Sequence, residues 1–180
     1  TCITLHNFTL NVDLHPALNK APLEPSQSRP VLVFSLEMPA SQLIMRLLSS
    51  IGKIDQTRMR SGNLTEDDWP RLSSAAQRLK DRPLFIDDTS GITPLEMRNR
   101  IKQFTRERVE QLRQEWHREH GSDTPADMEK LNEQAQPGMI MVDYLQLMSG
   151  SNPGEGRVQE ISQISRELKN LAREYECPMI

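Results

Sequence analysis

Short apolar runs alternate along most of this chain with longer stretches that have a helical repeat. Continuous apolar runs occupy residues 31–36 (VLVFSL), 84–86 (LFI) and 139–142 (MIMV), and a fourth begins at 178–180. Apolar runs of this length, without alternating polar residues, predict strands that are buried on both faces of a sheet.

Four stretches between these runs predict amphipathic helices. Two of them open with helix-start signals: Thr65 precedes Asp68, and Thr93 precedes Pro94 and Glu96. Strands that alternate with helices predict an α/β domain whose mainly parallel sheet is flanked by helices. Apolar residues recur at every third or fourth position in residues 43–51, 65–79, 93–117 and 158–175.

The remaining segments are polar and rich in turn-forming residues. Residues 1–29 carry no clear periodic pattern, and residues 149–156 (SGSNPGEG) predict a loop. Residues 119–138 predict a polar excursion on the surface. We therefore expect one domain core over residues 30–180, preceded by a poorly defined N-terminal segment.

Composition narrows the class of protein only a little. The chain has 180 residues, of which 36% are hydrophobic and 4% aromatic, so aliphatic side chains and Met must fill the core. A net charge of -3 argues against bulk coating of nucleic acid but permits a local basic loop. No apolar run approaches the roughly 18 to 20 residues that span a bilayer, so we expect no membrane partner.

The cysteines and the first residues predict a cytoplasmic protein. Cys2 and Cys177 lie near opposite ends of the chain and have no metal-ligand spacing. We expect two such isolated thiols to stay reduced, as they do in the cytoplasm. The first residues lack the basic and long apolar regions of a signal peptide. The chain begins with Thr, and we expect both of its ends to be cut from something longer.

Acidic residues follow three of the predicted strands, at the sheet edge where α/β proteins place their chemistry. Asp143 comes directly after an apolar strand, as do the acids that nucleotide hydrolases use to hold magnesium. Glu37 has the position of a general base for the attacking water. The alternative for Asp143 is that it caps the next turn. The alternative for Glu37 is that its negative charge stabilises the N-terminus of the following helix through the helix dipole. For Asp87 and Asp88, a local turn is the favoured interpretation.

Five segments in this order closely resemble the C-terminal motor domain of bacterial replicative DNA helicases, the DnaB family. The resemblance covers about residues 30–180 and implies a RecA-like P-loop NTPase core, truncated here at both ends. It also implies ATP and Mg²⁺ as cofactors, Glu37 as activator of the hydrolytic water, and Asp143 as the magnesium ligand. The segments are VLVFSLEMP (31–39), IDQTRMRSGNLTEDDW (54–69), FIDDTSGITPLEMR (85–98), MIMVDYLQLM (139–148) and EISQISRELKNLARE (160–174).

The same resemblance implies an assembly and its partners. Members of the family form a homohexameric ring that encircles single-stranded DNA and moves 5′ to 3′. ATP lies between subunits, and primase and a helicase loader are further partners. The loop after DYLQLM faces the central channel in similar proteins, so Arg157 is a candidate phosphate contact. A solvated or helix-capping role for Arg157 is the alternative.

The chain departs from the family at the phosphate-binding loop. No G-x-x-x-x-G-K-[ST] occurs in the 180 residues, and the pair Gly52-Lys53 lacks both the upstream glycine and the hydroxyl residue. Residues 1–29 stand where the loop would be. We expect that the chain by itself does not hydrolyse ATP, because nothing in it holds the triphosphate.

Two other functions compete with the helicase motor. The first is a RecA-like ATPase of the recombination type, which shares the strand-end acids but not the combination of IDQTRMRSG with DYLQLM. The second is a non-catalytic module that docks on a helicase ring. The missing phosphate loop favours this module, whereas the intact Glu37 and Asp143 argue against it.

Overall fold

The computed structural model describes residues 29–80, 82–150 and 156–180. The N-terminal segment 1–29, apart from its last residue, and most of the loop predicted at 149–156 lie outside these residues. The described elements are β1 (Val31–Ser35), α2 (Ala40–Gly52), α3 (Gln56–Ser61), α4 (Asp68–Lys80), β2 (Leu84–Asp87), α5 (Pro94–His120), α6 (Pro125–Ala135), β3 (Met139–Asp143), a 3-10 turn (Leu145–Leu147) and α7 (Arg157–Glu174).

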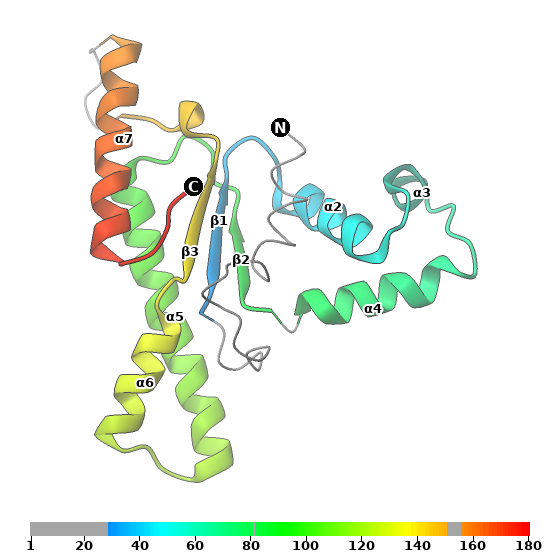
Figure 1. Cartoon of the computed structure of the whole chain (residues 1–180), viewed down its shortest axis with the longest axis horizontal. Helices are drawn as coiled ribbons and strands as arrows, with labels where there is room; N and C mark the ends of the chain where they lie inside the picture. The colour runs from blue at the N-terminus through cyan, green and yellow to red at the C-terminus, as the bar shows by residue number, and fades with distance from the viewer. Residues whose placement is uncertain (1–28, 81, 151–155) are drawn as a thin grey trace, which may run out of the picture. The chain divides into compact units, whose positions relative to one another are not determined.

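The three predicted strands form one parallel sheet in the order β2-β1-β3 (Figure 1). Val31 of β1 lies in register with Leu84 on one side and with Met139 on the other. The apolar run at the C-terminus pairs in parallel with β3: the Ile180 amide donates to the Ile140 carbonyl over 3.0 Å. The prediction of a mainly parallel α/β sheet is confirmed.

The chain divides into two compact units. Of the described residues, 44–80 belong to the first unit, and 29–43, 82–150 and 156–180 belong to the second. The second unit holds the sheet, with α5 and α7 packed on it (Figure 1). Its buried core joins alternate strand residues to the inner faces of these helices: Leu32, Phe34, Ile140, Met97, Ile101, Ile164, Leu168 and Leu171.

The segment predicted as a polar surface excursion contains a helix that was not expected from the sequence. Thr124 caps α6 through a capping box with Asp127, and Pro125 stands in the first turn. Leu131 and Ala135 are buried against α5. Few apolar residues carry the helical repeat here, which is why the polar composition concealed it.

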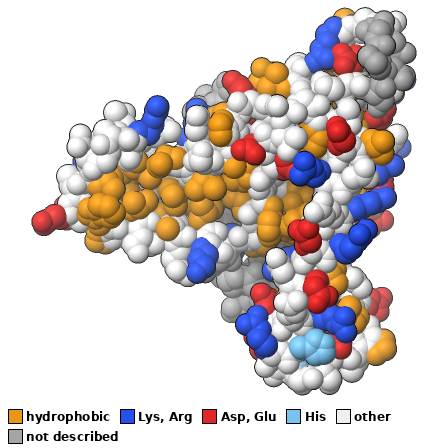
Figure 2. Space-filling model, turned by 180° about the vertical axis from the view of Figure 1, so that it is seen from behind, with side chains coloured by type: hydrophobic (Ala, Val, Ile, Leu, Met, Phe, Trp, Pro, Cys, Tyr) orange, Lys and Arg blue, Asp and Glu red, His pale blue; other side chains and the backbone are white. Residues whose placement is uncertain are grey.

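The described part of the first unit is a set of three helices, α2 from Ile44, α3 and α4. Arg58 of α3 donates to both carboxylate oxygens of Asp68 at 2.7 and 2.6 Å, and Thr65 donates to the same carboxylate. The helix predicted from residue 65 therefore begins at Asp68. Hydrophobic side chains gather along this unit in Figure 2. Two of its large hydrophobic residues, Ile44 and Trp69, are 39% and 59% exposed.

Candidate functional site

The ends of β1 and β3 bring the two predicted acids to the same edge of the sheet. Ser35 lies in register with Asp143, and the Leu36 amide donates to the Asp143 carbonyl over 2.8 Å. Glu37 follows directly after Leu36. β1 and β3 are parallel neighbours (Figure 1), so Asp143, the last residue of β3, and Glu37, two residues after β1, both lie at the carboxyl-end side of the sheet.

Neither of these two carboxylates has a hydrogen bond or ion pair with the described residues. Glu37 is exposed and Asp143 is half-buried. The 3-10 turn after β3 has Tyr144 at its N-cap and receives no side-chain cap, so Asp143 does not serve as the cap of that turn. Among the described residues neither carboxylate has a protein partner, so both are available to bind a cation or a water at this end of the sheet.

The short loop that carries Glu37 is held by hydrogen bonds on both sides of it. The buried Ser35 hydroxyl donates to the Met38 carbonyl over 2.7 Å. The Pro39 carbonyl then accepts from the Gln42 amide over 2.9 Å, which opens α2. The backbone around Glu37 is therefore fixed even though its side chain is exposed.

Asp87 and Asp88, at the end of β2, have different partners. Asp87 accepts from the Thr89 amide over 2.9 Å and lies 3.6 Å from Arg100, so the predicted local turn is present. Asp88 instead accepts from the Ala40 amide at the start of α2, over 2.9 Å. Sequence reasoning missed this contact because the two residues are far apart in the chain and neither belongs to a local motif.

Arg157, the candidate phosphate contact, opens α7 and has protein partners. Its guanidinium donates to the Gln146 carbonyl and to the Glu160 carboxylate. The Gly150 amide donates to Glu160 over 2.7 Å, and this bond, with the help of Arg157, lowers the pKa of the Glu160 carboxyl. To bind a phosphate, Arg157 would have to exchange one of these partners.

The donor set at the strand ends fits magnesium better than a transition metal. Among the described residues, no three His, Cys, Asp or Glu side chains form a metal-binding group. Mg²⁺ is commonly bound by one or two carboxylates, with phosphate and water oxygens completing its octahedron. The single carboxylate of Asp143, the predicted ligand, therefore suits an ion that arrives with a nucleotide rather than one held by the protein alone.

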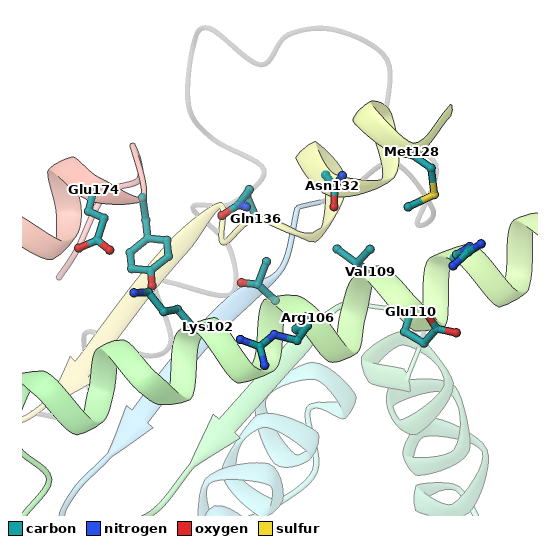
Figure 3. A pocket seen from close by; sticks show the side chains of 11 residues that line it. Lys102, Arg106, Val109, Glu110, Met128, Asn132, Gln136 and Glu174 are labelled. Atoms are coloured by element: carbon teal, nitrogen blue, oxygen red, sulfur yellow. The ribbon is translucent and has the colours of Figure 1, made fainter. Parts of the chain in front are cut away.

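A separate cleft of about 620 Å³ lies along α5 and contains none of the predicted site residues (Figure 3). Lys102, Arg106 and Glu110 of α5 line it together with Asn132 of α6 and Glu174 of α7.

None of the described helices is both long enough and apolar enough to cross a membrane.

Comparisons with protein families, curated proteins and solved structures all indicate the same family. The model of the family described as "DnaB-like helicase C terminal domain" matches residues 7–113 and 120–180. This match extends further toward the N-terminus than the resemblance described above, which begins near residue 30.

Curated relatives are replicative helicases. The chain is 41% identical over 154 residues to the replicative DNA helicase DnaB of Pasteurella multocida, covering 84% of the chain and 27% of that protein. It is 40% identical over 157 residues to the DnaB of Haemophilus influenzae, covering 86% and 28%. The replicative DNA helicase DnaC of Bacillus subtilis is 40% identical over 151 residues, covering 83% and 27%. The chain thus spans less than a third of the length of these relatives.

Solved structures agree with the sequence relatives. A structure described as a DnaB-like replicative helicase and its interactions with primase has a TM-score of 0.64 at 25% identity, covering 84% of this chain and 31% of that one. A second structure, described as an ATPase domain, has a TM-score of 0.60 at 26% identity, covering 84% and 45%. The sheet and its flanking helices are therefore those of a helicase ATPase domain.

Proposed function

The chain belongs to the DnaB-like helicase C-terminal domain family, and from that premise we propose that it is part of the motor of an ATP-dependent replicative DNA helicase. Within the motor, its part is to place the magnesium acid and the general base. The observation that carries this proposal is the pair of unpartnered carboxylates, Glu37 and Asp143, at the ends of adjacent parallel strands.

In this proposal Asp143 binds Mg²⁺, and the bound ATP supplies the phosphate that is transferred to water. Pairing with β1 fixes the backbone of Asp143 at the end of β3, from which its carboxylate would hold the cation directly or through a water. Nothing in the described protein competes for its oxygens.

Glu37 orients the attacking water and accepts its proton on a carboxylate oxygen. Its exposure leaves room for that water, and the hydrogen bonds on either side of it restrict where the carboxylate can reach. General-base catalysis of this kind contributes about 10²- to 10⁴-fold to turnover. For this role the backbone of Glu37 must be held in place while its carboxylate has no protein hydrogen-bond partner.

The proposal extends to the assembly that the family implies. ATP would lie between subunits of a homohexamer in the cytoplasm, with single-stranded DNA in the central channel. Arg157 would contact a DNA phosphate there in exchange for its bond to the Gln146 carbonyl. Primase is a proposed partner because one similar structure is described with its primase interactions; a helicase loader is proposed from the family alone.

Neither alternative function gains support from the comparisons. The relatives and structures above are described as replicative or DnaB-like helicases or as an ATPase domain, and none is described as a recombination protein. A module that only docks on a ring would have no use for two free strand-end acids.

A chimera tests the proposal. In this chimera, residues 30–180 of the chain replace the matching segment of the Haemophilus influenzae DnaB relative. The rest of the protein comes from that relative. We expect ATP-dependent unwinding of duplex DNA, and Glu37→Gln should lower kcat for ATP hydrolysis by about 10²-fold or more. Glu119→Gln, an exposed acid at the end of α5, is the matched control and should leave kcat unchanged. A hexameric chimera whose turnover survives Glu37→Gln would refute the proposal.

A further inference from the structure

The helix that follows Glu37 lacks a cap from its own sequence. The first turn of any helix leaves backbone amides without helical partners, and Ser, Thr, Asp or Asn at the N-cap usually accepts from one of them. In α2 the residue before the helix is Pro39, whose side chain has no acceptor. The first turn also contains no acidic residue.

Asp88 supplies the missing acceptor from another strand. Its Oδ2 accepts from the Ala40 amide over 2.9 Å, so a carboxylate from the end of β2 stands at the positive end of α2. This contact joins the start of α2 to the sheet. The helix-dipole role that was an alternative for Glu37 is filled here by Asp88.

Three hydrogen bonds then enclose the segment that carries Glu37. The Leu36 amide binds the Asp143 carbonyl before it, and the Ser35 hydroxyl binds the Met38 carbonyl across it. The Ala40 amide binds Asp88 after it. The anchors come from the ends of β3, β1 and β2 respectively, so each strand of the sheet contributes one.

We propose that Asp88 is a positioning residue for Glu37. By fixing the start of α2, it sets the backbone path from Leu36 to Ala40 and thereby the reach of the Glu37 carboxylate. The role rests on the proposed function, because positioning matters only if Glu37 acts on the water. Asp88 itself does not touch the reacting atoms.

The neighbouring acid provides a matched control. Asp87 has the same charge and the adjacent position, but its carboxylate accepts from the Thr89 amide and faces Arg100, and among the described residues it has no hydrogen bond to α2. A general loss of stability at the end of β2 would affect variants of both residues. Loss of the α2 anchor would affect only variants of Asp88.

The first measurement is amide hydrogen exchange in the 180-residue chain. Asp88→Ala should speed exchange of the Ala40 amide by about 2- to 30-fold, the range expected for loss of a helix cap. Asp88→Asn keeps an acceptor oxygen and should restore most of the protection, and Asp87→Ala should leave Ala40 unchanged. Equal exchange of Ala40 in Asp88→Ala and the parent chain would overturn the proposal.

The second measurement is ATP turnover in the chimera. Asp88→Ala should lower kcat by about 10- to 100-fold, as expected for a misplaced catalytic group, while KM for ATP changes by less than about twofold. Asp88→Asn should recover most of kcat, and Asp87→Ala should resemble the parent. A purely structural role would instead reduce the amount of folded hexamer and leave its kcat intact.

The two proposals fail in different ways. A Glu37-dependent chimera in which Asp88→Ala has the parent kcat would overturn the positioning role and leave the proposed function standing. A chimera whose turnover does not depend on Glu37 would overturn both. If Asp88→Ala does not fold, Asp88→Ser, whose shorter side chain does not reach the Ala40 amide, carries the same comparison against Asp88→Asn.

Discussion

The acidic residues of this chain separate into two groups by what surrounds each carboxylate. Asp68, Glu96 and Asp127 accept hydrogen bonds from protein amides or hydroxyls, and these bonds hold their pKa values below the usual range. Glu37 and Asp143 have no such partners in the described residues. Acids of the first group stabilise the fold, whereas those of the second are available for chemistry.

Asp68 makes a testable case for the first group. The amide and hydroxyl of Thr65 and the Arg58 guanidinium lower its pKa from the ordinary 3.8. Since the folded state binds this proton less readily than the unfolded state, the stabilisation is present above pH 3.8 and is lost as the pH falls through the lowered pKa.

We therefore expect Asp68→Asn to lower the free energy of unfolding at neutral pH and to weaken its loss on acidification. Urea unfolding followed by circular dichroism from pH 7 to pH 3 would measure both effects. The exposed neighbour Asp67→Asn is the control. Parallel stability curves for Asp68→Asn and the parent would show that the charge of Asp68, with its Thr65 and Arg58 partners, does not stabilise the fold.

At the scale of elements, the strands and long helices follow the apolar pattern. The helix α6 does not, and its N-terminal capping signal is what indicates it. The strands predicted at 31–36, 84–86 and 139–142 are β1, β2 and β3 to within one residue at each end. The helix predicted at 158–175 is α7. Thr124, Pro125 and Asp127 repeat the start signal of α5, and that signal marks α6 where the composition did not.

Packing between α5 and α6 predicts that the second helix depends on a few apolar contacts. Leu131 is 3% exposed and lies against Leu112. Leu131→Ala should destabilise the helical hairpin by about 2 to 5 kcal/mol, and hydrogen exchange of the α6 amides would report it. Asn132→Ala, on the exposed side of the same helix, should change little. Unchanged protection of α6 in Leu131→Ala would mean that the cap alone sustains the helix.

At the scale of the whole molecule, the two acids are present but the triphosphate has no binding loop. A phosphate-binding loop supplies a ring of backbone amides and a lysine, and these contribute most of the affinity for the phosphates. No such pattern occurs in the 180 residues. In the proposed function Asp143 and Glu37 would hold a cation and a water, but two carboxylates repel an anionic nucleotide when nothing neutralises its charge.

We therefore expect the isolated chain to bind ATP and Mg²⁺ no more tightly than about 1 mM in a calorimetric titration. The chimera, which has the relative's phosphate loop, should bind in the micromolar range under the same conditions. Asp143→Asn in the chimera should weaken the response to Mg²⁺ in particular. Micromolar binding or measurable turnover by the isolated chain would contradict this expectation.

The amino-acid sequence by itself determined the strands, the long amphipathic helices, the family and the identity of the two candidate acids. Apolar runs and helical repeats depend on residues close together in the chain, and the motifs around Glu37 and Asp143 are continuous stretches of sequence. These features are local, so they can be deduced without knowing how the chain folds back on itself.

Only the tertiary structure decided what stands beside those acids. The order β2-β1-β3 makes β1 and β3 neighbours, which places Asp143 next to the segment of Glu37. It also brings Asp88 to the Ala40 amide across a long separation in sequence. Such contacts depend on strand order and on the path of the intervening helices, and no local pattern of residues encodes either one.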